Sequence, residues 1–102
     1  ASQPCLTALF AANNLMTLGA LDAIRERGLK IPNDISIVGF DDMPWAALLQ
    51  PPLTAVAQPT YELGRKAAEL LLERLKNPDK PVNQVQFNTT LIVRGSSGKP
   101  RE

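Results

Sequence analysis

The stretch "SIVGFDDMPWAALLQPPLTAVAQ", residues 36 to 58, decides the fold, because one apolar run leads into two acids and a second ends at a glutamine. The run "ISIVGF" (35–40) is rich in β-branched residues and is typical of a strand buried on both faces. "LTAVAQ" (53–58) predicts another such strand. The two prolines before it end any helical turn over residues 44–49. A loop that starts at Asp41 and Asp42 is therefore expected to join the two strands.

The residues before this stretch predict a strand and a helix. "LTALFAA" (6–12) is a short apolar run that fits a buried strand, and it ends at Asn13 and Asn14. Charges then recur at helical spacing over residues 15–27, with Asn14 as the expected N-cap and Gly28 as the residue that ends the helix. A helical projection leaves Leu15 and Leu18 away from the arc expected to face the sheet, which holds Met16, Ala20, Leu21, Ala23 and Ile24.

The residues after this stretch predict a second helix and the end of the sheet. Pro59 suits the first position of a helix that runs to about Lys76. One face of this helix is apolar and has small residues that allow close packing on a sheet: Tyr61, Gly64, Ala67, Ala68, Leu71, Leu72 and Leu75. "QVQFNTTLIVRGSS" (84–97) predicts one or two final strands, and residues 95–102 are expected to form a flexible tail.

This alternation of strands and helices predicts an α/β fold with a mainly parallel sheet and flanking helices, with residues 1–102 forming a single partial domain. Right-handed crossovers bring the carboxyl ends of such strands to one edge, where ligands bind in open α/β sheets. Asn13, Asp41 and Gln58 each follow a predicted strand. One carboxylate and two amides suit a neutral ligand rich in hydroxyl or amide groups. A phosphate ligand is disfavoured because the sequence has no glycine-rich phosphate loop.

Each of these side chains also has a simpler structural explanation. Asn13 and Asn14 are equally suited to a turn and a helix cap, the acid pair 41–42 to a turn, and Gln58 to capping the next helix. Their joint placement favours a binding site. A second set of residues either covers the core or forms a surface for a partner: Trp45, Leu48 and Leu49. The partner surface is favoured because Leu15 and Leu18 also lie away from the core-facing arc of the neighbouring helix.

Composition excludes several classes of function. The net charge is +1, and the 11 basic residues are spread along the chain among 10 acidic ones. No basic stripe is therefore present to bind nucleic acid through this segment. The single cysteine, Cys5, is expected to be inert. With no histidine, the sequence predicts no metal site and no histidine-dependent catalytic triad. No run approaches the length of a membrane span, and the start "ASQPCLTALF" does not read as a signal peptide, so we expect the interior of a longer cytoplasmic protein.

From Leu6 to about Arg94 the chain closely resembles the C-terminal part of the effector-binding domain of LacI/GalR-type bacterial transcription regulators. The motifs that carry this resemblance are "GLKIPNDISIVGFDD" (28–42), "PPLTAV" (51–56) and "QP" (58–59). The resemblance implies a repressor about three times this length, with a helix-turn-helix domain, a hinge, and two subdomains of periplasmic-binding-protein-like fold. This sequence is expected to hold most of the second subdomain.

The resemblance also implies functional residues and partners. Asn13, Asp41 and Gln58 match family positions that contact the effector, and Asn14, Phe40 and Thr60 are candidates for residues close to it. Thr60 stands where the family often has an aromatic residue, and Asn14 replaces a usual Asp, so stacking on a sugar and one charge near the cleft are in doubt. The implied homodimer contacts are Leu15, Leu18, Trp45, Leu48 and Leu49.

The expected function is effector sensing without catalysis, cofactor or metal. A sugar is the expected ligand, a purine is the alternative, and DNA would be bound only through a helix-turn-helix domain absent from this chain. A rival hypothesis is a transport-associated sugar-binding protein, since it shares the fold. A phospho-receiver, suggested by the acid pair at a strand end, is disfavoured because receivers place their acid pair after the first strand.

Overall fold

The computed structural model describes residues 6–100, so Cys5 lies outside the described residues. These residues divide into two compact units. Unit 1 comprises the described residues up to Ala57 together with those from Thr90 onward. Unit 2 is the intervening segment Gln58–Thr89.

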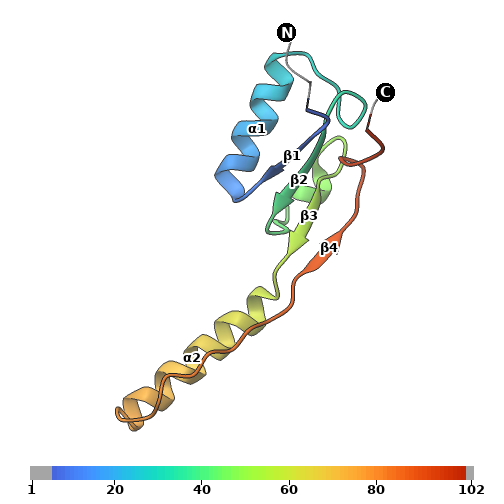
Figure 1. Ribbon diagram of the computed structural model, residues 1–102. Helices are drawn as coiled ribbons and strands as arrows, with labels where there is room; N and C mark the ends of the chain where they lie inside the picture. The colour runs from blue at the N-terminus through green and yellow to red at the C-terminus, as the bar shows by residue number, and fades with distance from the viewer. Residues whose placement is uncertain (1–5, 101–102) are drawn as a thin grey trace. The chain divides into compact units, whose positions relative to one another are not determined.

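Unit 1 contains a sheet in which three neighbouring strands are parallel, as the sequence predicted (Figure 1). The last strand pairs antiparallel with its neighbour, and it is the one strand in residues 84–97, where one or two were expected. The order across the sheet follows the chain: β1 (Ala8–Ala11), β2 (Ser36–Phe40), β3 (Thr54–Ala57) and β4 (Thr90–Ile92).

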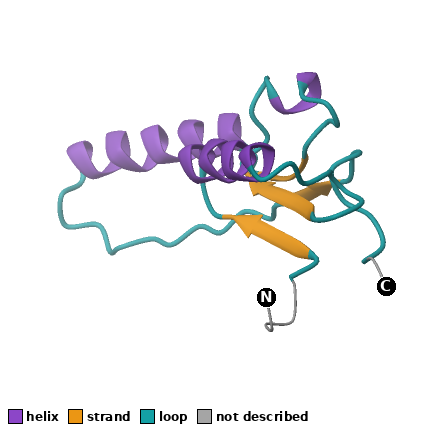
Figure 2. Cartoon of the chain, turned by 90° about the horizontal axis from the view of Figure 1, so that it is seen from above, coloured by secondary structure: helices purple, strands orange, loops and turns teal. Residues whose placement is uncertain are grey.

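One face of this sheet is covered by α1 (Asn14–Glu26) and by a 3-10 turn, η1 (Ala46–Leu48), which lie on the same side of the strands in Figure 2. Both elements contribute to the buried apolar cluster of unit 1, formed by Ile24, Ile37, Ala46 and Leu53. The turn within residues 44–49 is therefore confirmed, although it is shorter than expected.

The arc of α1 that faces the sheet differs from the predicted one. Ile24 is buried and Leu21 packs against the core as predicted, but Met16 is 58% exposed and Ala23 is also exposed. Thr17 is buried in their place, because its hydroxyl donates a hydrogen bond to the carbonyl of Asn13 at 2.8 Å. A threonine with a satisfied hydroxyl can thus occupy a core position of the helix.

The ends of α1 follow the predicted pattern with a shift of one residue at the start. Asn13 is the N-cap, and its side-chain oxygen accepts a hydrogen bond from the backbone nitrogen of Met16 at 2.9 Å. The expectation that Asn14 caps the helix is wrong, since Asn14 already belongs to the first turn. Gly28 follows the helix with φ of 68°, the left-handed conformation expected of a residue that ends a helix.

The residues after β4 depart from the flexible tail expected from position 95. Ser96 is 1% exposed, its backbone nitrogen donates to the carbonyl of Pro52, and its carbonyl accepts from Ile37, each at 2.9 Å. Gly98 also donates a backbone hydrogen bond to the hydroxyl of Ser36 at 3.1 Å. Residues 96–98 are therefore hydrogen-bonded to unit 1, and Ser96 is buried beside β2 and β3.

Unit 2 consists of α2 (Thr60–Lys76) and the extended segment after it. The predicted helix is confirmed, with Pro59 as its N-cap residue. No residue of α2 is buried, and its apolar face remains open: Tyr61, Leu71, Leu72 and Leu75 are 59–76% exposed. Within residues 6–100, neither helix is both long enough and apolar enough to cross a membrane.

Candidate functional site

The parallel register brings two of the predicted site residues to equivalent positions at one edge of the sheet. Ala11 of β1 is paired with Gly39 of β2, and Asn13 and Asp41 each lie two residues beyond this pair. An amide residue and an acid residue therefore follow β1 and β2 at equivalent positions of the register. This edge is the place where open α/β sheets bind their ligands.

Asn13 is held at this edge by the start of α1. Its carbonyl accepts hydrogen bonds from the nitrogen and the hydroxyl of Thr17, at 2.9 and 2.8 Å, while its side-chain oxygen caps the helix. Thr17 in turn packs over Gly39, where an added Cβ would meet the threonine hydroxyl at 3.3 Å. The simpler explanation of Asn13 as a cap is thus correct for its oxygen, and the cap leaves the amide nitrogen for another role.

Asp41 adopts a conformation that few side chains accept. Its φ is 76°, and it is the one non-glycine residue with positive φ among residues 6–100. Its backbone nitrogen donates to the carbonyl of Val56 at 2.8 Å, which extends the pairing of β2 and β3 by one residue. Aspartate tolerates the left-handed region better than most residues, at a cost of about 1 kcal/mol. The half-buried Asp41 therefore turns the chain sharply at the end of β2.

Phe40 lies on the sheet face opposite the apolar cluster. Its ring meets that of Phe10 edge to face, with centroids 6.4 Å apart. Phe10 remains 56% exposed, so this face of a mainly parallel sheet is not covered by the described chain. Parallel strands are usually covered on both faces. The open aromatic pair is therefore a surface that further polypeptide or a ligand can cover.

Gln58 and Thr60 belong to unit 2. Gln58 directly follows the last residue of β3, and its carbonyl accepts a hydrogen bond from the nitrogen of Thr60 at 2.8 Å. The convergence of Gln58 with Asn13 and Asp41 stays a prediction, as does the role of Thr60.

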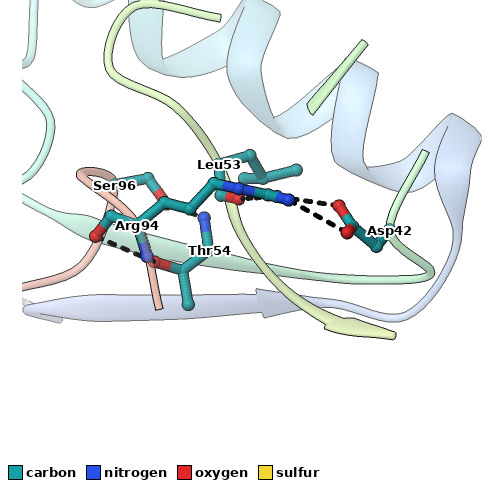
Figure 3. A network of polar contacts seen from close by, with 5 residues as sticks. All are labelled: Asp42, Leu53, Thr54, Arg94 and Ser96. Carbon is teal, nitrogen blue, oxygen red and sulfur yellow. Dashed lines mark hydrogen bonds and ion pairs between the residues drawn. The ribbon is translucent and has the colours of Figure 1, made fainter. Parts of the chain in front are cut away.

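An ion pair that sequence reasoning missed stands next to Asp41. The guanidinium of Arg94 donates two hydrogen bonds to Asp42, with Nη1 to Oδ1 at 2.7 Å and Nη2 to Oδ2 at 2.9 Å (Figure 3). These bonds hold the pKa of Asp42 below its usual value, while partial burial opposes the shift. The same pair raises the pKa of Arg94. Asp42 is therefore a charged structural partner of Arg94.

Asn14 differs from Asn13 in its surroundings. Its side-chain oxygen is buried and accepts no hydrogen bond from the described residues. A buried acceptor without a donor costs about 1–3 kcal/mol. Since the atom is inaccessible in this arrangement, direct contact of this oxygen with a ligand would require the start of α1 to change.

The candidate dimer residues fall into two groups. Leu15, Leu18 and Leu48 are exposed, at 80%, 47% and 79% respectively. Trp45 and Leu49 instead pack against the apolar cluster, which agrees with the simpler explanation that they cover the core. The exposed leucines are thus available for contacts with a partner, whereas Trp45 and Leu49 belong to the packing of the core.

Other kinds of site find less support in the described residues. Residues 6–100 contain no group of three or more acidic, cysteine or histidine side chains able to hold a metal ion. A groove of about 730 Å³ runs between α1, the connector after it and residues 49–53, and neither Asn13 nor Asp41 lines it. The edge that carries Asn13 and Asp41 is therefore separate from this groove.

Comparison with known proteins identifies the family. Residues 1–97 match the family described as periplasmic binding protein-like domain. The chain is 42% identical over 90 residues to the ribose operon repressor of Haemophilus influenzae, covering 88% of this chain and 27% of that protein. It is 43% identical over 93 residues to the HTH-type transcriptional repressor PurR of H. influenzae, covering 88% of this chain and 28% of that protein. The chain thus spans little more than a quarter of these curated relatives.

The solved structures that resemble this chain are also transcriptional regulators. A LacI family transcriptional regulator from Enterococcus faecalis V583 with bound ribose has a TM-score of 0.84 at 38% identity, over 94% of this chain and 36% of that one. The transcriptional regulator CelR–cellobiose complex has a TM-score of 0.82 at 40% identity, over 89% of this chain and 28% of that one. The chain therefore belongs to the family of periplasmic binding protein-like domains, and within it is similar to LacI-family transcriptional regulators.

Proposed function

We propose that this chain is the effector-sensing part of a LacI-type transcription regulator, in which Asn13, Asp41 and Gln58 bind a small hydroxyl-rich ligand. The observation that carries the proposal is the equivalent register of Asn13 and Asp41 beyond paired β1 and β2, with Gln58 directly after β3. Successive parallel strands thus supply an amide, an acid and an amide. Similarity to transcriptional repressors, and to a LacI family regulator that holds bound ribose, supports it.

A sugar fits this set of groups best. An ionised carboxylate accepts hydrogen bonds from hydroxyl groups, and each amide both donates and accepts. Similar structures hold ribose and cellobiose, which are neutral and rich in hydroxyls. A purine base remains the second candidate ligand, because its ring nitrogens and exocyclic groups also pair with amides.

The open apolar surfaces support a site completed by other parts of a longer protein. The aromatic pair on the uncovered sheet face and the exposed apolar face of α2 need further polypeptide to cover them. The relatives are more than three times as long as this chain, which is sufficient for a second lobe and a DNA-binding domain. A ligand that prefers one arrangement of the lobes would shift the population towards it and so alter DNA binding.

The same proposal includes a homodimer and a cytoplasmic, non-enzymatic role. Leu15, Leu18 and Leu48 would form the contact surface, with Trp45 and Leu49 beneath it. DNA would be bound by the helix-turn-helix domains of the dimer, whose spacing matches the half-sites of an operator. A transport-associated sugar-binding protein shares the fold, but the names of the relatives favour a regulator.

Titration calorimetry of the full-length regulator with ribose, and then cellobiose, tests the ligand site. Asp41→Asn keeps a residue that tolerates positive φ but removes the charge, so affinity should fall by about 2 kcal/mol. Asp22→Asn, on the exposed side of α1, is the matched control and should leave affinity unchanged.

A second pair of variants separates the two functions of Asn13. Asn13→Asp preserves the helix cap but removes the amide donor, so stability should be retained while affinity falls. Asn13→Ala should lose both. If Asn13→Asp and Asp41→Asn bind both sugars as tightly as the unaltered protein, the effector role of this edge is wrong.

A further inference from the structure

We propose that Arg94 is a positioning residue for the effector site: through Asp42 it fixes the left-handed turn at Asp41 and so the direction of the Asp41 carboxylate. The inference rests on the proposed effector role of Asp41. It adds a residue that lies 52 positions along the chain from Asp42 and that is not itself expected to touch the ligand.

The ion pair between Arg94 and Asp42 is bidentate. Arg94 uses both terminal nitrogens on Asp42, and Nη1 also donates to the carbonyl of Leu53 at 2.8 Å (Figure 3). The two side chains are 20% and 24% exposed, so solvent competes only partly for these bonds. A bidentate pair restricts both the distance and the rotation of the carboxylate, whereas a lysine would supply a point charge.

Arg94 is itself anchored through its backbone. Its backbone nitrogen donates a hydrogen bond to the hydroxyl oxygen of Thr54 at 2.8 Å, and that hydroxyl donates to the carbonyl of Arg94 at 3.2 Å. Thr54 is 2% exposed, and its own nitrogen donates to the hydroxyl of Ser96 at 2.7 Å. The backbone of Arg94 is therefore anchored to the buried Thr54 of β3, so its guanidinium can hold the loop in place.

The turn between Asp41 and Asp42 is held from both sides. The backbone nitrogen of Asp41 donates to the carbonyl of Val56, which fixes the chain on the N-terminal side of the turn. The next residue, Asp42, is held by Arg94, which fixes the chain on the C-terminal side. A non-glycine residue persists in the left-handed region only when its surroundings hold it there. The two anchors thus supply what Asp41 needs to keep φ at 76°.

Charge gives the arrangement a second effect. Two adjacent carboxylates repel each other, and Arg94 neutralises the one at position 42. This ion pair reduces the repulsion between positions 41 and 42 and so favours the turn that joins them.

A readout that needs no ligand tests the turn directly. In Arg94→Met, the backbone amide of Asp41 should exchange with solvent about tenfold faster, because the loop is no longer held. The amide of Ile37, in the middle of β2, should keep its protection. The matched control is Arg65→Met, which removes an exposed arginine paired with Glu69 and should change neither amide. Equal acceleration at Asp41 and Ile37 would mean a general loss of stability and would overturn the proposal.

A double-mutant cycle in the full-length regulator tests the consequence for binding, with ribose and cellobiose as probes. Arg94→Met should weaken binding about tenfold in the unaltered protein, and Arg94→Lys should restore only part of it. In the Asp41→Asn background, Arg94→Met should have little further effect, since Arg94 acts through Asp41. Full additivity of the two substitutions would overturn the proposal.

The cycle also distinguishes this inference from the proposed function. If the unaltered regulator binds neither sugar, the assignment of the ligand fails, and exchange at Asp41 alone decides whether Arg94 holds the turn. If the sugars bind and Asp41→Asn has no effect, the effector role of Asp41 fails and the positioning role fails with it.

Discussion

The hydroxyl of Ser96 lies 2.7 Å from the backbone nitrogen of Thr54 and accepts its hydrogen bond, although the two residues are 42 positions apart. The same hydroxyl donates to the carbonyl of Ile37 at 2.6 Å. One side chain therefore satisfies a buried donor on β3 and a buried acceptor on β2.

Loss of this hydroxyl should destabilise unit 1. Ser96→Ala leaves the nitrogen of Thr54 and the carbonyl of Ile37 without this partner, and it should lower the free energy of unfolding by about 2 kcal/mol. Ser97→Ala is the matched control, since Ser97 contacts only the hydroxyl of Thr54 in this network and is less buried. Urea unfolding followed by circular dichroism measures both, and similar losses for the two variants would contradict the expectation.

Acid should weaken the fold through Asp42. The pKa of Asp42 is lowered in the folded chain by its hydrogen bonds with Arg94, so the charged form binds more tightly than the protonated one. The stabilisation is complete above the unfolded value near 3.8 and is lost as pH falls through the lower folded pKa. The difference in unfolding free energy between the protein and Asp42→Asn should therefore shrink as pH drops below about 4. A constant difference down to about pH 2 would count against the ion pair.

Two glycines should respond in opposite directions to the same substitution. At Gly39 an added Cβ would meet Leu53 Cδ2 at 3.1 Å and Thr17 Oγ1 at 3.3 Å, so Gly39→Ala should cost about 1–3 kcal/mol of stability. At Gly19, inside α1, no atom lies within 4 Å, so Gly19→Ala should add about 0.5–1 kcal/mol. Thermal unfolding of the two variants gives the comparison, and a stabilising Gly39→Ala would show that β2 does not approach α1 this closely.

The proposed dimer predicts different effects for exposed and supporting residues. Leu15→Glu and Leu48→Glu alter side chains that are 80% and 79% exposed, so they should weaken self-association while the circular dichroism spectrum is unchanged. Trp45→Ala should lower stability instead, because Trp45 packs against the core. Sedimentation equilibrium of the full-length regulator measures the association, and unchanged dimers in both glutamate variants would place the interface elsewhere.

The strands and the first helix were predictable because their signals are local. Apolar runs with β-branched residues gave the three parallel strands, and Gly28 marked the end of α1. Thr17 was missed because a helical projection counts threonine as polar, although its hydroxyl is satisfied by Asn13 within one turn. The position of the cap shifted by one residue for the same local reason, since Asn13 and Asn14 are equally good caps by type.

The pairings that anchor the site were not predictable from the sequence. Arg94 and Asp42 are separated by most of the chain, and many arginine–aspartate combinations are compatible with the composition. Residues 95–97, "GSS", are typical of a loose end, and only the fold places Ser96 where two strands need a hydroxyl.

The pairing of Ala57 with Thr90 has a practical consequence for protein engineering. These residues are partners at the start of the antiparallel pair of β3 and β4, and the whole of Gln58–Thr89 lies between them. In terms of topology the segment is an enlarged hairpin loop, so a two-residue Asn-Gly turn is long enough to replace it. A shortened gene of this kind would encode the sheet, α1 and the Arg94 anchor as a minimal scaffold for grafting new recognition loops.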